Sequence, residues 1–200
     1  MTSTRLRCFF TELCQVALGV TLCAAVLAGC GGGRSNPAVN GPARLPEAPQ
    51  APTITATSAG PLRLGMPAEE VQRLPNYTVD RLTQKLEGFS TPALRVAQFG
   101  TNQALVELQN EQAWRIAVLT ETWRTAEGAR VGMTAAELEK IYGPGTVAAG
   151  EGNVCALFER APGLSFCFEA ADELQGLGSG DWANLRERNP RVRRILVVGE

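Results

Sequence analysis

The sequence predicts an α+β fold in which two helix-plus-antiparallel-strand repeats form one compact globular unit, with the helices packed on one face of the sheet. Three observations support this prediction. A segment that begins at Arg63 returns 67 residues later at Arg130, each copy has the pattern of a short helix start, and alternating apolar and polar residues follow each copy. Of the 200 residues, 44% are hydrophobic and 20% are charged, which is enough apolar material for a core.

The first thirty residues differ in composition from the rest of the chain. Arg5 and Arg7 precede an apolar run over residues 13–28, and the sequence Leu-Ala-Gly-Cys then ends at Cys30. The run is short for a membrane-spanning helix, which needs about twenty residues. These features resemble the signal peptide and lipobox of bacterial lipoproteins. The resemblance implies cleavage before Cys30, a diacylglycerol on its thiol and an acyl chain such as palmitate on its amino group.

The segment after the lipobox has the composition of a flexible tether. Gly31, and not Asp, follows the cysteine, so the resemblance implies the periplasmic face of the outer membrane. Residues 31–60 are rich in Gly, Pro, Ala, Ser and Thr and bury too little apolar surface to offset the entropy of ordering. The predicted division is a signal peptide at 1–29, a lipidated N-terminus and tether at 30–60, a first repeat at 61–127 and a second repeat at 128–200.

The first repeat is predicted to open with a short helix that begins near Pro67, a residue that suits a helix start. Val71 and Leu74 recur at helical spacing. Strands follow where apolar residues alternate with polar ones and turn residues separate the runs. The alternation of Trp114 with two β-branched residues predicts a core position for this side chain. The expected strands are Tyr77–Leu82, Ala93–Phe99, Ala104–Leu108 and Trp114–Thr120.

The second repeat is predicted to open with a helix after Thr134. Thr134 and Glu137 fit a capping box, in which each side chain binds a backbone amide of the other residue, and Gly143 suits the end of the helix. An insertion rich in glycine covers residues 170–190 and predicts a short helix from Asp181. The last expected strand is Val192–Val198.

Cys155 and Cys167 are predicted to form a disulfide. The other cysteines belong to the leader or the lipobox, and an oxidising compartment favours the bond. A hairpin that sets Phe158 against Leu164 also sets the two cysteines opposite each other, about 4.5 to 5.5 Å apart at Cβ, on the face away from the aromatic residues. A register slip of one residue would separate them. A metal or redox pair is the alternative, although the spacing is not CxxC.

The segment Val131–Gly145 has a Gly-Met-Thr sequence before a helix that ends near Gly and Pro. It resembles the opening signature of the BamE (SmpA/OmlA) lipoproteins, and the same motif opens repeats of the β-lactamase-inhibitor-protein-like fold. The resemblance implies tandem units of helix plus antiparallel strands. The first copy departs from the motif with Pro67 in place of Thr, and BamE has a single unit, so a shared role in outer-membrane protein assembly does not follow from the fold.

The available side chains argue against an enzyme. The chain has no histidine, which removes Ser-His and Cys-His catalysis and most zinc sites. The net charge of −1 does not suggest a nucleic-acid partner. No cofactor and no metal is predicted, although the loop at 172–181, with Asp172, Glu173 and Asp181, leaves calcium open as an alternative.

The predicted function is that of a membrane-anchored, non-enzymatic protein that binds another envelope protein as an assembly factor or scaffold. Trp123 and Trp182 lie at the edges of predicted elements and are the candidate partner-binding residues. Alternatives are an inhibitor of a periplasmic hydrolase, and a small-ligand-binding protein or enzyme that uses a pocket between the repeats. A basic C-terminal segment predicts either a solvated edge strand or a contact with anionic lipid; it contains Arg186, Arg188, Arg191, Arg193 and Arg194.

Overall fold

The computed structural model describes residues 51–86, 89–150, 153–168, 174 and 176–199. The chain divides into residues 1–45 and residues 46–200, and all described residues belong to the second part. The predicted leader, Cys30 and most of the predicted tether therefore lie outside the described residues. Within the described ranges, no helix is both long and apolar enough to cross a membrane.

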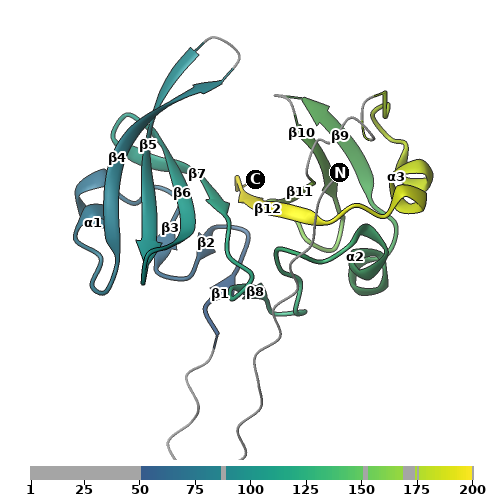
Figure 1. Ribbon diagram of the computed structural model, residues 1–200, viewed down its shortest axis with the longest axis horizontal. Helices are drawn as coiled ribbons and strands as arrows, with labels where there is room; N and C mark the ends of the chain where they lie inside the picture. The colour runs from purple at the N-terminus through teal and green to yellow at the C-terminus, as the bar shows by residue number, and fades with distance from the viewer. Residues whose placement is uncertain (1–50, 87–88, 151–152, 169–173, 175, 200) are drawn as a thin grey trace, which may run out of the picture. The chain divides into compact units, whose positions relative to one another are not determined.

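An eight-stranded antiparallel sheet dominates the fold (Figure 1). Its strand order is β4-β5-β6-β7-β12-β11-β10-β9, so two four-stranded meanders join side by side through their last strands, β7 and β12. The strands of the first meander are β4 (Thr78–Leu86), β5 (Phe89–Gln98), β6 (Thr101–Gln109) and β7 (Gln112–Val118). Those of the second are β9 (Thr146–Gly150), β10 (Asn153–Leu157), β11 (Leu164–Phe168) and β12 (Val192–Val197).

A second, smaller sheet consists of two-residue strands in the order β3-β2-β1-β8. Residues 51–60, which the composition assigned to the tether, belong to the folded domain, because Ile54 and Ala59 are buried and Gly60 lies against the ring of Trp123. The few apolar residues of this segment are buried because its two short strands pair with each other and with their neighbours β3 and β8. The strands are β1 (Thr53–Ile54), β2 (Ser58–Ala59), β3 (Leu62–Arg63) and β8 (Arg124–Thr125).

The predicted α+β class is wrong, because strands dominate the domain and the helices do not form a layer on one face of the sheet. The three helices of the described residues are only five, eight and seven residues long: α1 (Ala68–Gln72), α2 (Ala135–Tyr142) and α3 (Trp182–Arg188). In the first copy Pro75 disfavours a helical conformation at Leu74 and so limits α1. Such short helices offer too narrow an apolar face to cover strands of nine or ten residues.

The repeated segment of the sequence makes a repeated pattern of backbone hydrogen bonds. In the first copy the amide of Gly65 donates to the carbonyl of Ala113 at 2.7 Å, and the amide of Ala113 donates back to the residue after the glycine at 2.9 Å. In the second copy Gly132 and Val192 make the same two bonds, each at 2.8 Å. Both glycines have a positive φ, of 78° and 87°, which favours glycine. Each Gly-Met turn therefore pairs with the start of the last strand of its own copy.

The predicted helix starts are confirmed. In α2 the amide of Glu137 donates to the hydroxyl of Thr134 at 3.3 Å, and the amide of Thr134 donates to the Glu137 carboxylate at 2.8 Å. Pro67 is the N-cap residue of α1. Asp181 is the N-cap of α3 and accepts from the amide of Asn184 at 3.3 Å.

The main core lies against one face of the large sheet. An aromatic cluster forms its part in the second meander, with ring centroids 5.4 to 5.6 Å apart, from Tyr142, Phe158, Phe166 and Trp182. The strands contribute alternate, fully buried residues, among them Val96, Ala104, Val106, Ile116, Val118 and Ile195. The alternation of side chains along a strand directs the remaining positions to the other face.

Candidate functional site

The other face of the eight-stranded sheet is the candidate functional site. Cross-strand pairing defines the residues that share it, because directly opposed residues project from the same side of a sheet. We use the name second face for one row of paired residues that crosses all eight strands, together with its neighbours Glu107, Arg115, Cys155 and Cys167. The row consists of Asp80, Arg95, Leu105, Ala117, Leu196, Ser165, Leu157 and Thr146.

The centre of the second face is apolar. Ala117, Cys167 and Leu196 form a buried cluster of their own, with half-buried Leu105 and Cys155 packed against it. All five residues come from strands, and within the described ranges no helix or loop residue joins them. Beside this cluster is a shallow hollow of about 260 Å³, which reaches the edge strand β9. It is lined by Ala148, Ala149, Gly150, Asn153, Cys155, Leu157, Ser165 and Leu196.

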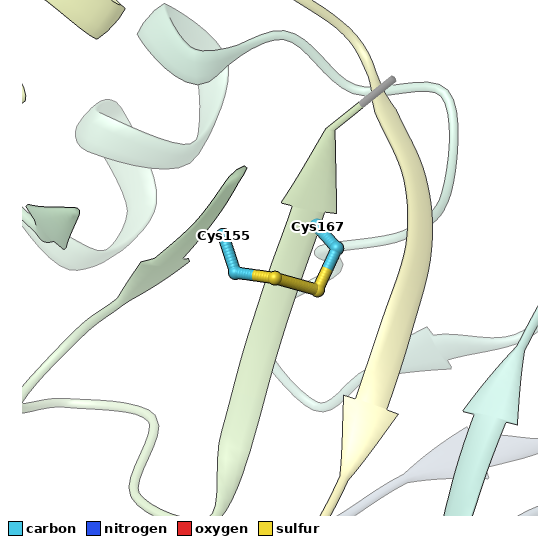
Figure 2. Close-up of a disulfide and its surroundings, with 2 residues drawn as sticks. All are labelled: Cys155 and Cys167. Carbon is cyan, nitrogen blue, oxygen red and sulfur yellow. A yellow bond between two sulfur atoms is a disulfide. The ribbon is translucent and has the colours of Figure 1, made fainter. Parts of the chain in front are cut away.

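The predicted disulfide is confirmed and lies on the second face. Cys155 and Cys167 are directly opposed in the pairing of β10 with β11, and their sulfur atoms are bonded (Figure 2). Phe158 and Phe166 belong to the core on the opposite side, as the predicted register required. The bond encloses a loop of about a dozen residues, so it stabilises the domain by roughly 3 kcal/mol. It also holds two strands of the second face in one register.

A buried ion pair lies at the other end of this surface. The guanidinium of Arg115 contacts one carboxylate oxygen of Glu107 through Nη2 at 2.7 Å and Nε at 3.0 Å, and the two side chains are 11% and 4% exposed. The same guanidinium lies 4.7 Å from the centroid of the Trp114 ring, within the range of a cation–π contact. A charged pair with so little solvent around it holds its geometry tightly.

The exposure of Trp114 corrects the predicted core position of its side chain. The pairing of β6 with β7 shifts register after Glu107, so that Arg115 opposes Glu107 and Ala113 opposes Leu108. Trp114 lies in the resulting bulge, which redirects its side chain. It is 39% exposed, and it is the one tryptophan of the chain with a substantial accessible surface.

Trp123 and Trp182, the predicted partner-binding residues, are buried in the domain. Trp123 is 1% exposed and packs against Gly60. Trp182 is 8% exposed, and its indole N–H donates to Glu139 at 3.0 Å. Both lie at element edges, as the sequence indicated, but they turn inward against the small sheet and α2. The structure therefore gives neither residue a surface that a partner can reach.

The other predicted site residues are either engaged within the domain or outside the described ranges. Cys30, Asp172 and Glu173 are outside them. In the part of the chain that the structure covers, no group of three or more Cys, Asp or Glu side chains converges as a metal site. The C-terminal arginines make intramolecular contacts: Arg186 with Glu139, Arg188 with Asn184, and Arg191 with the carbonyl of Gly132.

A small cavity of about 240 Å³ beside the small sheet is the second place where polar groups converge. The Tyr142 hydroxyl lies 2.7 Å from the hydroxyl of Thr125 and donates to Glu127 at 3.2 Å. Burial raises the pKa of Tyr142 to about 12. Hydrogen bonds from its own backbone amide and from Thr125 lower the pKa of Glu127. Neither pKa is shifted toward neutral pH, as the pKa of a general acid or base would be.

Comparison with known proteins adds information on the fold alone. No family model matches the chain, and no curated protein matches its sequence. The crystal structure of the uncharacterized protein yfeY from Escherichia coli is similar, with a TM-score of 0.52 and 17% sequence identity. The match covers 72% of this chain and 97% of that chain. At this identity the likeness shows a shared fold and does not extend to a function.

Proposed function

We propose that this chain is a lipid-anchored, non-enzymatic envelope protein that binds another envelope protein through the second face of its sheet. The observation that carries the proposal is the row of opposed residues across all eight strands, with apolar side chains at its centre. A broad surface with an apolar centre and a polar margin has the usual anatomy of a protein–protein interface. The margin here consists of the ion pairs Asp80–Arg95 and Glu107–Arg115.

Two exposed residues are the proposed anchors for the partner. Trp114 is 39% exposed and stacks on a guanidinium that is itself held by Glu107, so its ring is ordered before binding. Leu157 is 40% exposed and lines the hollow at the other side of the second face. Ordered aromatic side chains bind with little loss of conformational entropy and often dominate the binding energy.

The membrane location rests on the leader and lipobox. A cleaved, acylated Cys30 on an outer-membrane leaflet would leave the folded domain, which begins near residue 51, on a short tether in the periplasm. Several acyl chains hold a protein stably at a membrane surface without a spanning helix. The disulfide between Cys155 and Cys167 supports an oxidising compartment.

A crosslinking pull-down of the mature protein from envelope membranes tests the proposal. The variants are Trp114→Ala and Leu157→Arg, and the control is Ala183→Arg, which places the same charge on the exposed side of α3. We expect one stoichiometric envelope protein with the wild type and the control, and at least a tenfold loss of it with each second-face variant.

Recovery of the same protein with all variants would refute the second face as the binding surface. Recovery of no protein above background would refute the partner-binding function itself. If the captured protein is a hydrolase, inhibition of its activity by the wild type, lost in Leu157→Arg, identifies the interaction as that of an inhibitor.

A further inference from the structure

The turn between β5 and β6 carries the most exposed large hydrophobic residue of the described chain. Gln98 pairs with Thr101, so Phe99 and Gly100 form a two-residue hairpin turn. Both have a positive φ, of 50° and 77°, as a type I′ turn requires. The Phe99 side chain is 96% exposed to solvent.

The hairpin fold does not require phenylalanine at this position. The turn between β6 and β7 has the same two-residue geometry, with Asn110 at a φ of 52° and Glu111 at 59°. Asparagine adopts this left-handed conformation readily, and Glu111 forms an ion pair with Arg81. At Phe99, by contrast, the left-handed backbone conformation disfavours a bulky residue, and exposure of the apolar ring to water is also unfavourable. Phe99 is thus present in spite of the folding energetics, which points to a contact outside the domain.

The two chain segments next to the Phe99 tip carry no charged residues. Thr78 opposes Ala97 in the pairing of β4 with β5, so the segment before β4 lies beside the hairpin tip. Residues 74–79 and 96–106 contain no Asp, Glu, Lys or Arg. The turn at the other end of β6, by contrast, carries Glu111, which forms an ion pair with Arg81 of β4. A charge-free tip can leave water without the penalty of burying an ion.

The chain also enters the domain at this end. The β7 strand runs toward the same end as the β5–β6 turn, and β8 follows it after a short connection. There β1 pairs with β8, and the amide of Arg124 donates to the carbonyl of Pro52 at 3.2 Å. Figure 1 shows the end of β5 and the β1–β8 pair at the lower end of the view. The Phe99 tip therefore lies at the end of the domain where the chain continues toward Cys30.

We infer that the Phe99 hairpin tip inserts into the interfacial region of the lipid bilayer and is a second, reversible membrane contact of this protein. The inference rests on the membrane location proposed above and extends it to the orientation of the domain. Aromatic residues favour the membrane–water interface, and Tyr77 lies half-buried in the charge-free segment before β4. The inserted tip would orient the domain relative to the membrane.

Fluorescence quenching by brominated lipids tests this inference on the full, processed chain. The variant Phe99→Trp is reconstituted in vesicles of phosphatidylethanolamine and phosphatidylglycerol that are brominated on the acyl chains near the glycerol. Asn110→Trp is the matched control, because it places the same probe at the same turn position of the β6–β7 hairpin. Subtraction of the wild-type signal removes the three native tryptophans. We expect a blue-shifted emission and at least a twofold loss of the added fluorescence for Phe99→Trp, and no change for Asn110→Trp.

Equal quenching of the two probes, or no quenching of either, would overturn the inference. A blue shift that appears only when envelope proteins are added, without quenching by brominated lipid, would also overturn it and would indicate a protein pocket. Mass spectrometry of the same sample reports acylation of Cys30 independently. If mass spectrometry finds no acyl groups on the processed chain, the lipid anchor is refuted. If Phe99→Trp is quenched in that same sample, the membrane contact of the hairpin tip is still supported.

Discussion

The hydroxyl of Tyr142 makes the free energy of unfolding of the domain depend on pH in the alkaline range. The variant Tyr142→Phe removes the ionisable hydroxyl, so a comparison with the wild type measures this effect. The folded-state pKa is about 12, above the ordinary value of 10.0 that applies to the unfolded chain, because burial disfavours the charged phenolate. A raised folded-state pKa means that the stabilisation is complete below pH 10 and is lost as the pH rises toward 12. The linkage relation gives a loss of about 1 kcal/mol at pH 11 and about 2 kcal/mol at pH 12.

Urea unfolding of the wild type and Tyr142→Phe at pH 8 and pH 11, followed by far-ultraviolet circular dichroism, measures this loss. At pH 8 the variant is expected to be less stable by about 1 to 2 kcal/mol, because the buried hydroxyl of Thr125 loses a hydrogen-bond partner. At pH 11 the difference should shrink by about 1 kcal/mol. Tyr77, whose pKa is also raised by burial, is present in both proteins, so its effect cancels. A difference that stays constant between the two pH values would refute a structural role for Tyr142 and reopen its cavity as a site for proton chemistry.

Four further predictions concern the elements that hold the second face and the helix after the second repeated turn. Reduction of the disulfide should lower the free energy of unfolding by up to about 3 kcal/mol, as measured by urea unfolding with and without a reductant, and a cysteine-to-alanine double variant should show no response to the reductant. Glu107→Ala should destabilise the domain by about 3 kcal/mol, because the buried guanidinium of Arg115 loses its carboxylate, whereas Glu107→Gln should cost less. An equal effect of the two substitutions in thermal unfolding would contradict this role of the charge. Thr134→Ala should cost about 1 kcal/mol through loss of the helix cap. Hydrogen bonds from Thr134 lower the pKa of Glu137, so the advantage of the wild type over Glu137→Gln should hold above pH 4.5 and disappear as the pH falls below it.

The features that the sequence predicted correctly depend on local interactions. The capping box of Thr134 and Glu137, the helix after Asp181 and the Cys155–Cys167 register all follow from residues close together in the chain. A turn, a cap or a hairpin is specified by its own few residues, so a single sequence is enough to recognise it.

The fold class and the partner-binding residues depend on contacts that a single sequence does not display. The predicted helices are present but too short to form a layer, and α1 has only five residues. The strand β9, rich in Ala and Gly, was not predicted, because it has little β propensity and forms by pairing with β10. Trp114 was assigned to the core because the alternation of its strand continues through a bulge that only the partner strand reveals.

The repeated turns explain how a sheet with one core can keep a second face for binding. Each Gly-Met turn bonds to the first residues of the last strand of its meander, so β7 and β12 are each held at one end in addition to pairing with each other. Ala117 and Leu196 meet at this seam, on the second face. The disulfide and the Glu107–Arg115 pair fix the strands on either side of the seam. A surface held in this way loses little entropy on binding, so substitutions at the seam should change partner affinity mainly through the dissociation rate.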